Sequence, residues 1–180
     1  MIRLFVGLAL PPDIRRVLAG LATGIPGARW VDEENYHLTL RFIGEVAEND
    51  AHDIHDALSG VRARRFDLML SGVGHFENGG EVHTLFAAAE REPALMQLRA
   101  NIESALVRFG VKPDGRRFQP HVTLARMRGA PPDRVSLFLA AHALLRAGPI
   151  AIDHFALYSS FLREAGPIYQ VEAEYTLALV

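Results

Sequence analysis

The chain has 180 residues, of which 49% are hydrophobic and 22% charged, and its formal net charge at pH 7 is -2. This size and composition suit one compact domain or two small fused lobes, and the small net charge excludes attraction of nucleic acid by overall charge alone. The absence of cysteine excludes disulfides, thiolate metal sites and a cysteine nucleophile. The apolar residues 1–10 are too few to span a bilayer, so we expect a first strand in a cytoplasmic protein.

Hydrophobic periodicity predicts strands and helices along the whole chain. In chain order we expect strand 2–9, helix 12–22, strand 36–43, helix 49–60, strands 66–73 and 82–89, helix 92–109, strand 120–127, helix 131–145, and strands 150–158 and 168–179. The glycine-rich stretches 71–81 and 163–167 each lie between two strands and are typical of hairpin loops.

Two of these strands contain the same polar pair. "YHLTLRFIG" places His37 and Thr39 two residues apart in an apolar run, and "PHVTLARM" does the same with His121 and Thr123. Because side chains alternate between the faces of a strand, each histidine shares a face with its threonine, while the residues between and after them point to the core. A single such strand could simply hold a half-buried histidine, but two copies are unexpected when the chain has only 8 histidines.

The surroundings of the two pairs also repeat. Asp67 lies 30 residues after His37, and Asp153 lies 32 residues after His121. The order helix, H-x-T strand, helix, strand, hairpin, strand occurs in both halves. We therefore predict an internal duplication in an α+β fold: one bilobal domain over residues 1–180, with two antiparallel sheets flanked by helices and equivalent strands facing each other across a central cleft.

Two histidines that share a cleft can act as an acid and a base without a nucleophilic side chain. Histidine titrates near neutral pH, so one ring can accept a proton while the other donates one. The neighbouring threonine hydroxyls can donate hydrogen bonds to an anion held between the rings. This combination suits attack on phosphorus and requires no metal.

The two motifs resemble the paired HxTx signatures of the 2H phosphoesterases, at residues 37–40 and 121–124. "YHLTLRFIGEV" and "QPHVTLAR" carry the resemblance, with histidines 84 residues apart, and it extends to "RLFVGLALPP" and "LYSSFLREAGPIYQV" near the two ends. Within this superfamily the chain is most similar to the LigT-like RNA 2′,3′-cyclic phosphodiesterases, also called 2′-5′ RNA ligases. The resemblance implies hydrolysis of RNA 2′,3′-cyclic phosphate ends to 2′-phosphomonoesters without metal or cofactor.

The resemblance also implies roles for individual residues. His37 would be the proton donor to the 3′-oxygen, and His121 the proton acceptor that activates water. Thr39 and Thr123 would bind the phosphate oxygens. Arg126 resembles a phosphate-binding arginine of the family, although strict alternation directs it away from His121 unless the strand bulges or ends there.

Other candidates near the motifs have two interpretations each. Phe42, five residues after His37, could stack on a base or pack in the core. Alternation places Arg41 on the His37 face, where it would be exposed or bind phosphate. The basic cluster before the second motif could steer RNA or form a solvated loop; it contains Lys112, Arg116 and Arg117.

Alternatives to hydrolysis stay open at this level. The same chemistry could join or cleave 2′-5′ RNA linkages or open another cyclic nucleotide, and a non-catalytic RNA-binding module could retain the fold. His52 and His55 have a spacing that a metal could use, but a polar helix face explains them better. We expect no metal, no cofactor, no membrane partner and no obligate protein partner, and a monomer that acts on RNA ends or cyclic nucleotides.

Overall fold

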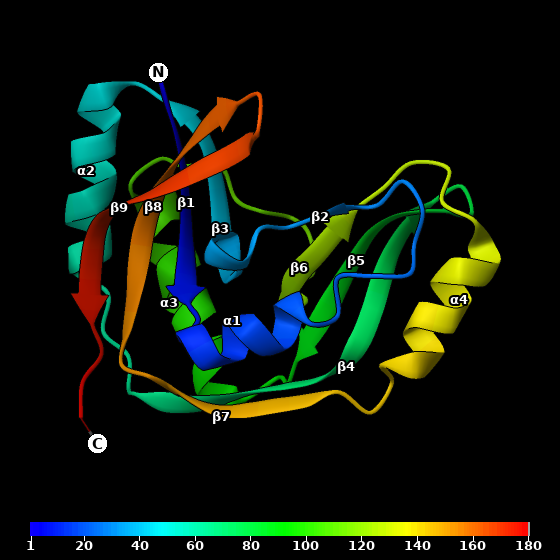
Figure 1. Cartoon of the computed structure of the whole chain (residues 1–180). Helices are drawn as coiled ribbons and strands as arrows, with labels where there is room; N and C mark the ends of the chain where they lie inside the picture. The colour runs from blue at the N-terminus through cyan, green and yellow to red at the C-terminus, as the bar shows by residue number, and fades with distance from the viewer. Residues whose placement is uncertain (180) are drawn as a thin grey trace.

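A computed structural model describes residues 1–179 of the chain as an α+β fold with four α-helices and a large antiparallel sheet (Figure 1). The elements in chain order are β1 (Ile2–Ala9), α1 (Pro12–Ala19), β2 (Arg29–Trp30), the 3₁₀ helix η1 (Glu33–Asn35), β3 (His37–Val46), α2 (Glu48–Ser59), β4 (Phe66–Asn78), β5 (Glu81–Ala89), α3 (Pro93–Arg108), β6 (His121–Arg126), α4 (Pro132–Ala141), β7 (Arg146–Ile152), β8 (His154–Arg163) and β9 (Gly166–Thr176).

The strands form one sheet, not the two separate sheets predicted. Their order is β7-β4-β5-β6-β3-β1-β8-β9, and β2 pairs with β6 beside this path. The two H-x-T strands, β3 and β6, are neighbours at the centre, joined through the single pair Leu38↔Val122. The prediction that these strands face each other across a cleft is therefore wrong: they lie side by side and separate on either side of one contact.

Each side of this junction combines strands from both halves of the chain. Outward from β3 come β1, β8 and β9, and outward from β6 come β5, β4 and β7. In the chain, β1-α1-β3-α2 is followed by β4, and β5-α3-β6-α4 is followed by β7 and β8. The hairpin that follows each H-x-T strand thus lies in the opposite half of the sheet. This order agrees with an internal duplication, which stays an interpretation.

Two predicted boundaries are wrong for identifiable reasons. The stretch 71–81 is not a loop, because β4 continues through it to Asn78 and only Gly79 and Gly80 form the turn, both with positive φ. Gly74 lies within this strand, and the Phe86 ring packs against it. A Cβ at this position would lie 2.6 Å from that ring, which explains the glycine. The stretch 150–158 is divided at Asp153 between β7 and β8, which lie in different halves of the sheet.

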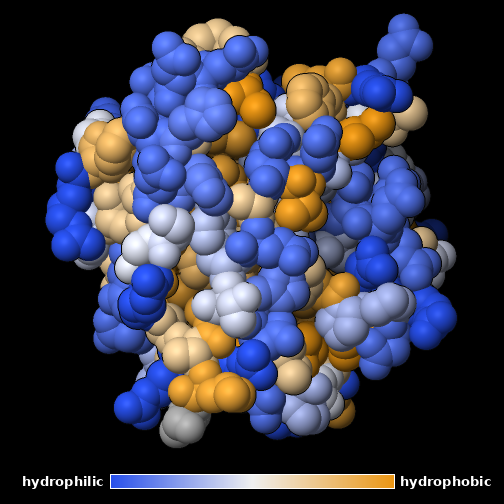
Figure 2. Space-filling model, turned by 90° about the vertical axis from the view of Figure 1, so that its left-hand side faces the viewer, coloured by the Kyte–Doolittle hydropathy of each residue, from blue (hydrophilic) through white to orange (hydrophobic). Residues whose placement is uncertain are grey.

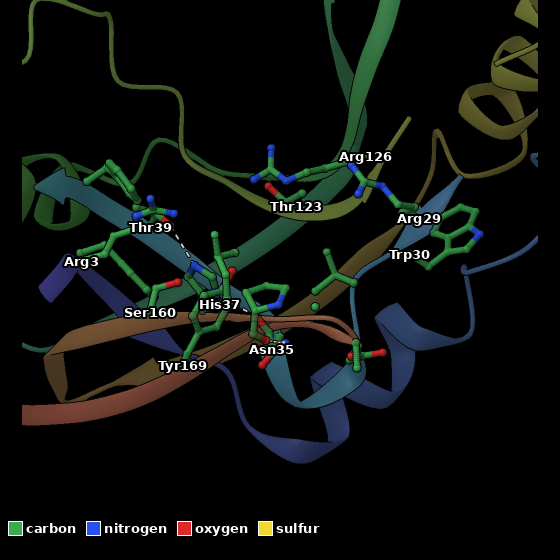
Figure 3. Close-up of a pocket in the computed structure, with 18 of the residues that line it drawn as sticks. Arg3, Arg29, Trp30, Asn35, His37, Thr39, Thr123, Arg126, Ser160 and Tyr169 are labelled. Carbon is green, nitrogen blue, oxygen red and sulfur yellow. Dashed lines mark hydrogen bonds between the residues drawn. The ribbon is translucent and has the colours of Figure 1, made fainter. Parts of the chain in front are cut away.

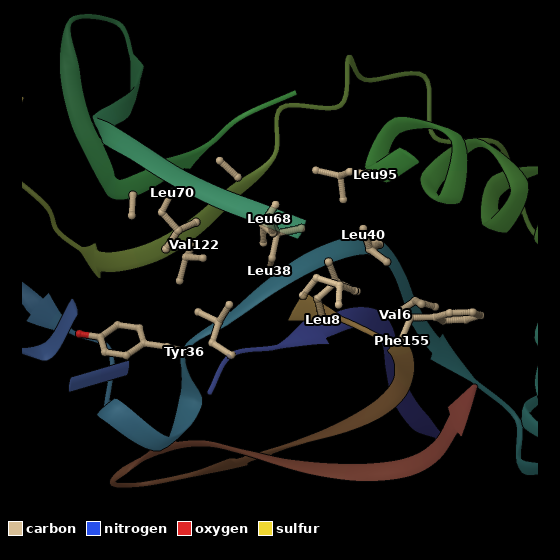
Figure 4. Packing of buried hydrophobic residues seen from close by; sticks show 14 of the residues in the cluster. Val6, Leu8, Tyr36, Leu38, Leu40, Leu68, Leu70, Leu95, Val122 and Phe155 are labelled. Carbon is tan, nitrogen blue, oxygen red and sulfur yellow. The ribbon is translucent and has the colours of Figure 1, made fainter. Parts of the chain in front are cut away.

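The core is built from both halves of the sheet. Leu38 and Val122 are fully buried, and so are their neighbours Leu8, Leu68 and Leu70 (Figure 4). At about 25 cal/mol per Å² of buried apolar surface, such side chains are each worth about 1.5–3 kcal/mol. Burial of these side chains on one side of β3 and β6 leaves His37 and His121 on the other side.

The helices bury one face and expose the other. α3 begins with Glu92, whose carboxylate accepts a hydrogen bond from the Leu95 amide, followed by Pro93. α2 buries only Ile54 and Leu58, and hydrophilic side chains cover most of the face of the molecule on which α2 lies (Figure 2). Across residues 1–179 no helix combines the length and the apolar character needed to cross a membrane.

Alternation predicts that Arg41 lies on the His37 face, exposed or bound to phosphate. The structure contradicts this prediction, because Arg41 is buried. It is 6% exposed, and its guanidinium donates to the Glu103 carboxylate and to the backbone carbonyl of Lys112. Burial alone would raise the pKa of Glu103, but hydrogen bonds from Arg41 and from the Asp114 amide outweigh it and lower the pKa. This ion pair connects β3 to α3 and to the loop that leads into β6.

The Arg41–Glu103 pair should therefore contribute to stability. Replacing Glu103 by Gln leaves the buried guanidinium without its counter-charge, so we expect the free energy of unfolding to fall by about 3 kcal/mol, measured by urea denaturation. Glu45→Gln is the matched control, because Glu45 pairs with Arg3 at a surface position at 2.9 Å. That change should cost about 1 kcal/mol or less. Equal losses in the two variants would contradict a special role for the buried pair.

Candidate active site

The pair Leu38↔Val122 determines how the two motifs meet. In an antiparallel register, residues before one member lie opposite residues after the other, so His37 lies toward Thr123 and Thr39 toward His121. All four side chains point away from the buried face that Leu38 and Val122 occupy. Each histidine therefore has its own threonine beside it along the strand and the other motif's threonine across from it.

Both motif strands bulge at the same position, three residues after the histidine. In β3 the pairing with β1 skips Leu40, and in β6 the pairing with β5 skips Leu124. A bulge reverses the alternation beyond it. The residue five after each histidine consequently returns to the pocket face, and this brings Phe42 and Arg126 to the site.

These residues line one pocket of about 700 Å³. His37, Thr39, Thr123 and Arg126 lie near its centre (Figure 3). Phe42 from β3 and His121 from β6 also line it. The remaining lining residues come from β1, β2, the segment before β3, and the β8–β9 hairpin; the polar and aromatic ones among them include Arg3, Phe5, Arg29, Trp30, Asp32, Asn35, Ser160, Glu164 and Tyr169. Phe42 is 47% exposed, so its interpretation as a core residue is wrong.

The two histidines are held in the same way. Nδ1 of His37 donates to the carbonyl oxygen of Asn35 at 2.7 Å, and Nδ1 of His121 donates to that of Gln119 at 2.6 Å. A carbonyl can only accept, so Nδ1 carries a hydrogen in both rings and Nε2 is the atom that gains or loses a proton. Nε2 of His37 lies 2.9 Å from the hydroxyl of Thr39, which donates to it when the ring is neutral.

The pKa values of both imidazole rings are lowered from the ordinary value of histidine. Burial lowers the pKa of His37 below its ordinary value of 6.5; the hydrogen bond to Asn35 opposes this change, and the positive charges of His121 and Arg126 add to it. Burial also lowers the pKa of His121 below 6.5, again with opposition from its backbone hydrogen bond and a contribution from Arg126. Because the repulsion between the two rings is mutual, it disfavours the doubly charged pair, and the apparent pKa values belong to the pair.

Aromatic rings surround each imidazole and explain its burial. Phe5 and Tyr169 pack against His37 with ring centroids at 4.8 and 5.0 Å. Phe76 and Phe86 pack against His121, both at 5.0 Å. Since Phe5 lies on β1 and Phe86 on β5, the two strands that flank the motif strands supply equivalent rings. These rings fix the orientation of the imidazoles and exclude water from their faces.

Several residues considered from sequence lie outside the pocket. The basic cluster does not line it: the carbonyl of Lys112 binds Arg41, and Arg116 pairs with Asp114. His55 hydrogen-bonds to Tyr175 through Nδ1 at 2.8 Å, which gives it a structural partner. No group of three His, Asp or Glu side chains that could hold a metal ion occurs in residues 1–179.

Other pocket residues did not emerge from the sequence at all. Arg3, Arg29 and Trp30 belong to strands whose neighbours are distant in the chain. Asn35 positions His37 through its carbonyl and holds the β8–β9 hairpin by donating from its side chain to the Pro167 carbonyl at 3.0 Å. The sequence contained one local signal that could have pointed to Arg29 and Trp30, which is their position shortly before the first motif.

The family of the chain is evident from sequence and structure. The model of the LigT like Phosphoesterase family matches residues 8–83 and 85–169. A curated RNA 2′,3′-cyclic phosphodiesterase of Aeropyrum pernix is 36% identical over 151 residues, which are 82% of this chain and 85% of that protein. One from Thermus thermophilus is 36% identical over 186 residues, covering 97% of this chain and 90% of that protein.

Solved structures show the same fold. The crystal structure of E. coli LigT complexed with 3′-AMP has a TM-score of 0.78 and 26% identity, with 98% of each chain covered. The apo form of E. coli LigT gives the same values. Together with the family match over most of its length, these similarities show that the chain belongs to the LigT-like phosphoesterase family.

Proposed function

We propose that the chain hydrolyses 2′,3′-cyclic phosphate ends of RNA to 2′-phosphomonoesters by acid–base catalysis with two histidines. The observation that carries this proposal is the junction of β3 and β6, which brings both H-x-T pairs and Arg126 to one pocket. Curated relatives named RNA 2′,3′-cyclic phosphodiesterase and the 3′-AMP complex of E. coli LigT support the substrate class. We predict in addition that the enzyme is cytoplasmic, is a monomer and needs no metal.

The proposed reaction is a displacement at phosphorus. Nε2 of His121 takes a proton from a water molecule, whose oxygen forms a bond to phosphorus. The bond from phosphorus to the 3′-oxygen breaks, and its electron pair takes the proton that Nε2 of His37 donates. The product has a 2′-phosphate and a 3′-hydroxyl. His121 is then charged and His37 neutral, so one proton must return to His37 before the next turnover.

The bound phosphodiester would prepare this protonation state. In the empty pocket the pKa values of both rings are lowered, but the roles above need a proton on Nε2 of His37. A phosphate anion beside His37 stabilises the charged imidazolium and raises its pKa. Protons are shared by the pair, so binding of the anion can redistribute them without a change in structure.

The remaining residues would bind the phosphate and the base. Thr39 and Thr123 flank the two rings and can donate to non-bridging oxygens, and Arg126 can form a charge-assisted hydrogen bond to the same phosphate. Phe42 offers an exposed ring on which a base of any identity could stack.

Replacement of either histidine by alanine should lower kcat by about 10²- to 10⁴-fold, because each removes one proton transfer. A substrate with sulfur in place of the 3′-oxygen separates the two roles, since a thiolate leaves without a proton. His37→Ala should recover most of its rate with this substrate, whereas His121→Ala should not. Rates with oxygen and sulfur substrates are compared for each variant.

His52→Ala is the matched control, because His52 lies exposed on α2 away from the pocket. It should keep full activity with both substrates. Recovery of His121→Ala instead of His37→Ala would reverse the assignment of acid and base. Full activity of the double variant His37→Ala, His121→Ala would eliminate the mechanism.

The pH dependence of kcat/KM should be bell-shaped, with its maximum below 6.5, because the pKa values of both histidines in the free enzyme are lowered from that value. The positive charge of Arg126 contributes to both shifts. Arg126→Met removes it, so both pKa values rise and the whole profile moves to higher pH. The maximal kcat/KM should also fall, by about tenfold or more, through loss of a charged hydrogen bond.

Arg128→Met removes an exposed charge that does not line the pocket and is the control for this experiment. Its profile should match that of the unchanged enzyme. A shift of the Arg126→Met profile to lower pH would show that the charge of Arg126 does not act on the histidines as described.

A further inference from the structure

The pocket contains three arginines that differ in their partners. Arg3 pairs with Glu45 at 2.9 Å, so a carboxylate offsets its charge. Arg29 and Arg126 also line the pocket, and neither forms an ion pair with any carboxylate of residues 1–179. Two cations of the pocket are therefore available to an anion from solution.

Arg29 and Arg126 lie directly opposite each other on paired strands. β2 and β6 are antiparallel, and their register joins Arg29 to Arg126 and Trp30 to Ala125. Side chains in such positions have Cβ atoms about 4.5–5.5 Å apart, and like charges there destabilise the pair of strands. An anion that binds both guanidinium groups, or two anions that bind one each, would remove this repulsion.

The two guanidinium groups point to different parts of the pocket. Arg126 extends over Thr123, at the reaction centre, whereas Arg29 lies farther out on the Trp30 side (Figure 3). Of the acidic residues that line the pocket, Asp32 comes from the same segment as Arg29 and Glu164 from the β8–β9 turn, and neither is joined to Arg29 by an ion pair. Arg29 is thus positioned for an anion adjacent to the reacting phosphate, separated from it along the substrate.

The covalent structure of RNA supplies such an anion. A chain that ends in a 2′,3′-cyclic phosphate carries its next negative charge at the internucleotide phosphate on the 5′ side of the terminal sugar. A free cyclic mononucleotide has no such phosphate. We propose that Arg29 binds this internucleotide phosphate, so that the pocket selects the end of an RNA chain over a free cyclic mononucleotide; this rests on the proposed function.

The test compares a 2′,3′-cyclic mononucleotide with a dinucleotide that ends in the same cyclic phosphate. The unchanged enzyme should prefer the dinucleotide in kcat/KM by about 10- to 100-fold, the effect of one hydrogen bond between charged groups. Arg29→Met should abolish most of this preference. Arg29→Lys should restore part of it, since lysine keeps the charge but not the planar fork.

A binding measurement provides a readout that does not need turnover. The dinucleotide product with a terminal 2′-phosphate is titrated into each variant at several salt concentrations. Loss of one phosphate contact should reduce the slope of log K against log salt by about 0.7 in Arg29→Met. Arg128→Met, which removes an exposed charge that does not line the pocket, should retain both the slope and the dinucleotide preference.

The outcomes separate the two proposals. Equal losses on both substrates in Arg29→Met would place Arg29 on the reacting phosphate and overturn the assignment, as would an unchanged preference. If the unchanged enzyme hydrolyses neither substrate, the proposed function fails, while the salt dependence still shows whether Arg29 contacts a second phosphate.

Discussion

The contact between Leu38 and Val122 is the constraint on which the pocket depends. Within residues 1–179 it is the only register pair that joins β3 to β6, and both side chains are completely buried. A slip of one residue in this register would expose leucine and valine and turn His37 and His121 into the core, at a cost of several buried apolar side chains. Packing on the hydrophobic face therefore positions the polar groups on the opposite face.

What is local in the chain could be predicted from sequence. Four helices, most strands and the common face of each histidine with its threonine follow from periodicity within ten or so residues. The resemblance of the two motifs to each other directed attention to the correct pair of strands. Strand alternation implied that Arg126 reaches the site only if the strand bulges or ends there, and the bulge at Leu124 is the first of these alternatives.

Features that depend on residues distant in the chain could not be predicted from the sequence. Alternation misplaced Arg41 because the bulge at Leu40 reverses the faces of β3, and Glu103, 62 residues away, then holds the guanidinium inside. The single sheet depends on one interstrand pair, which no local pattern reveals. Arg29 was overlooked for the same reason: its significance comes from the strand pairing that sets it opposite Arg126.

The electrostatics of the pocket point to a site that an anion completes. Burial lowers the pKa values of His37 and His121, although the proposed reaction needs one of them charged, and Arg29 faces Arg126 without an ion pair to a carboxylate of residues 1–179. Each feature is unfavourable in the empty pocket, and a phosphodiester would relieve both. It would offset the repulsion between the guanidinium groups and raise the pKa of the imidazole beside it. Binding and activation of the acid would thus be a single electrostatic event, confined to substrates that bring negative charge to this position.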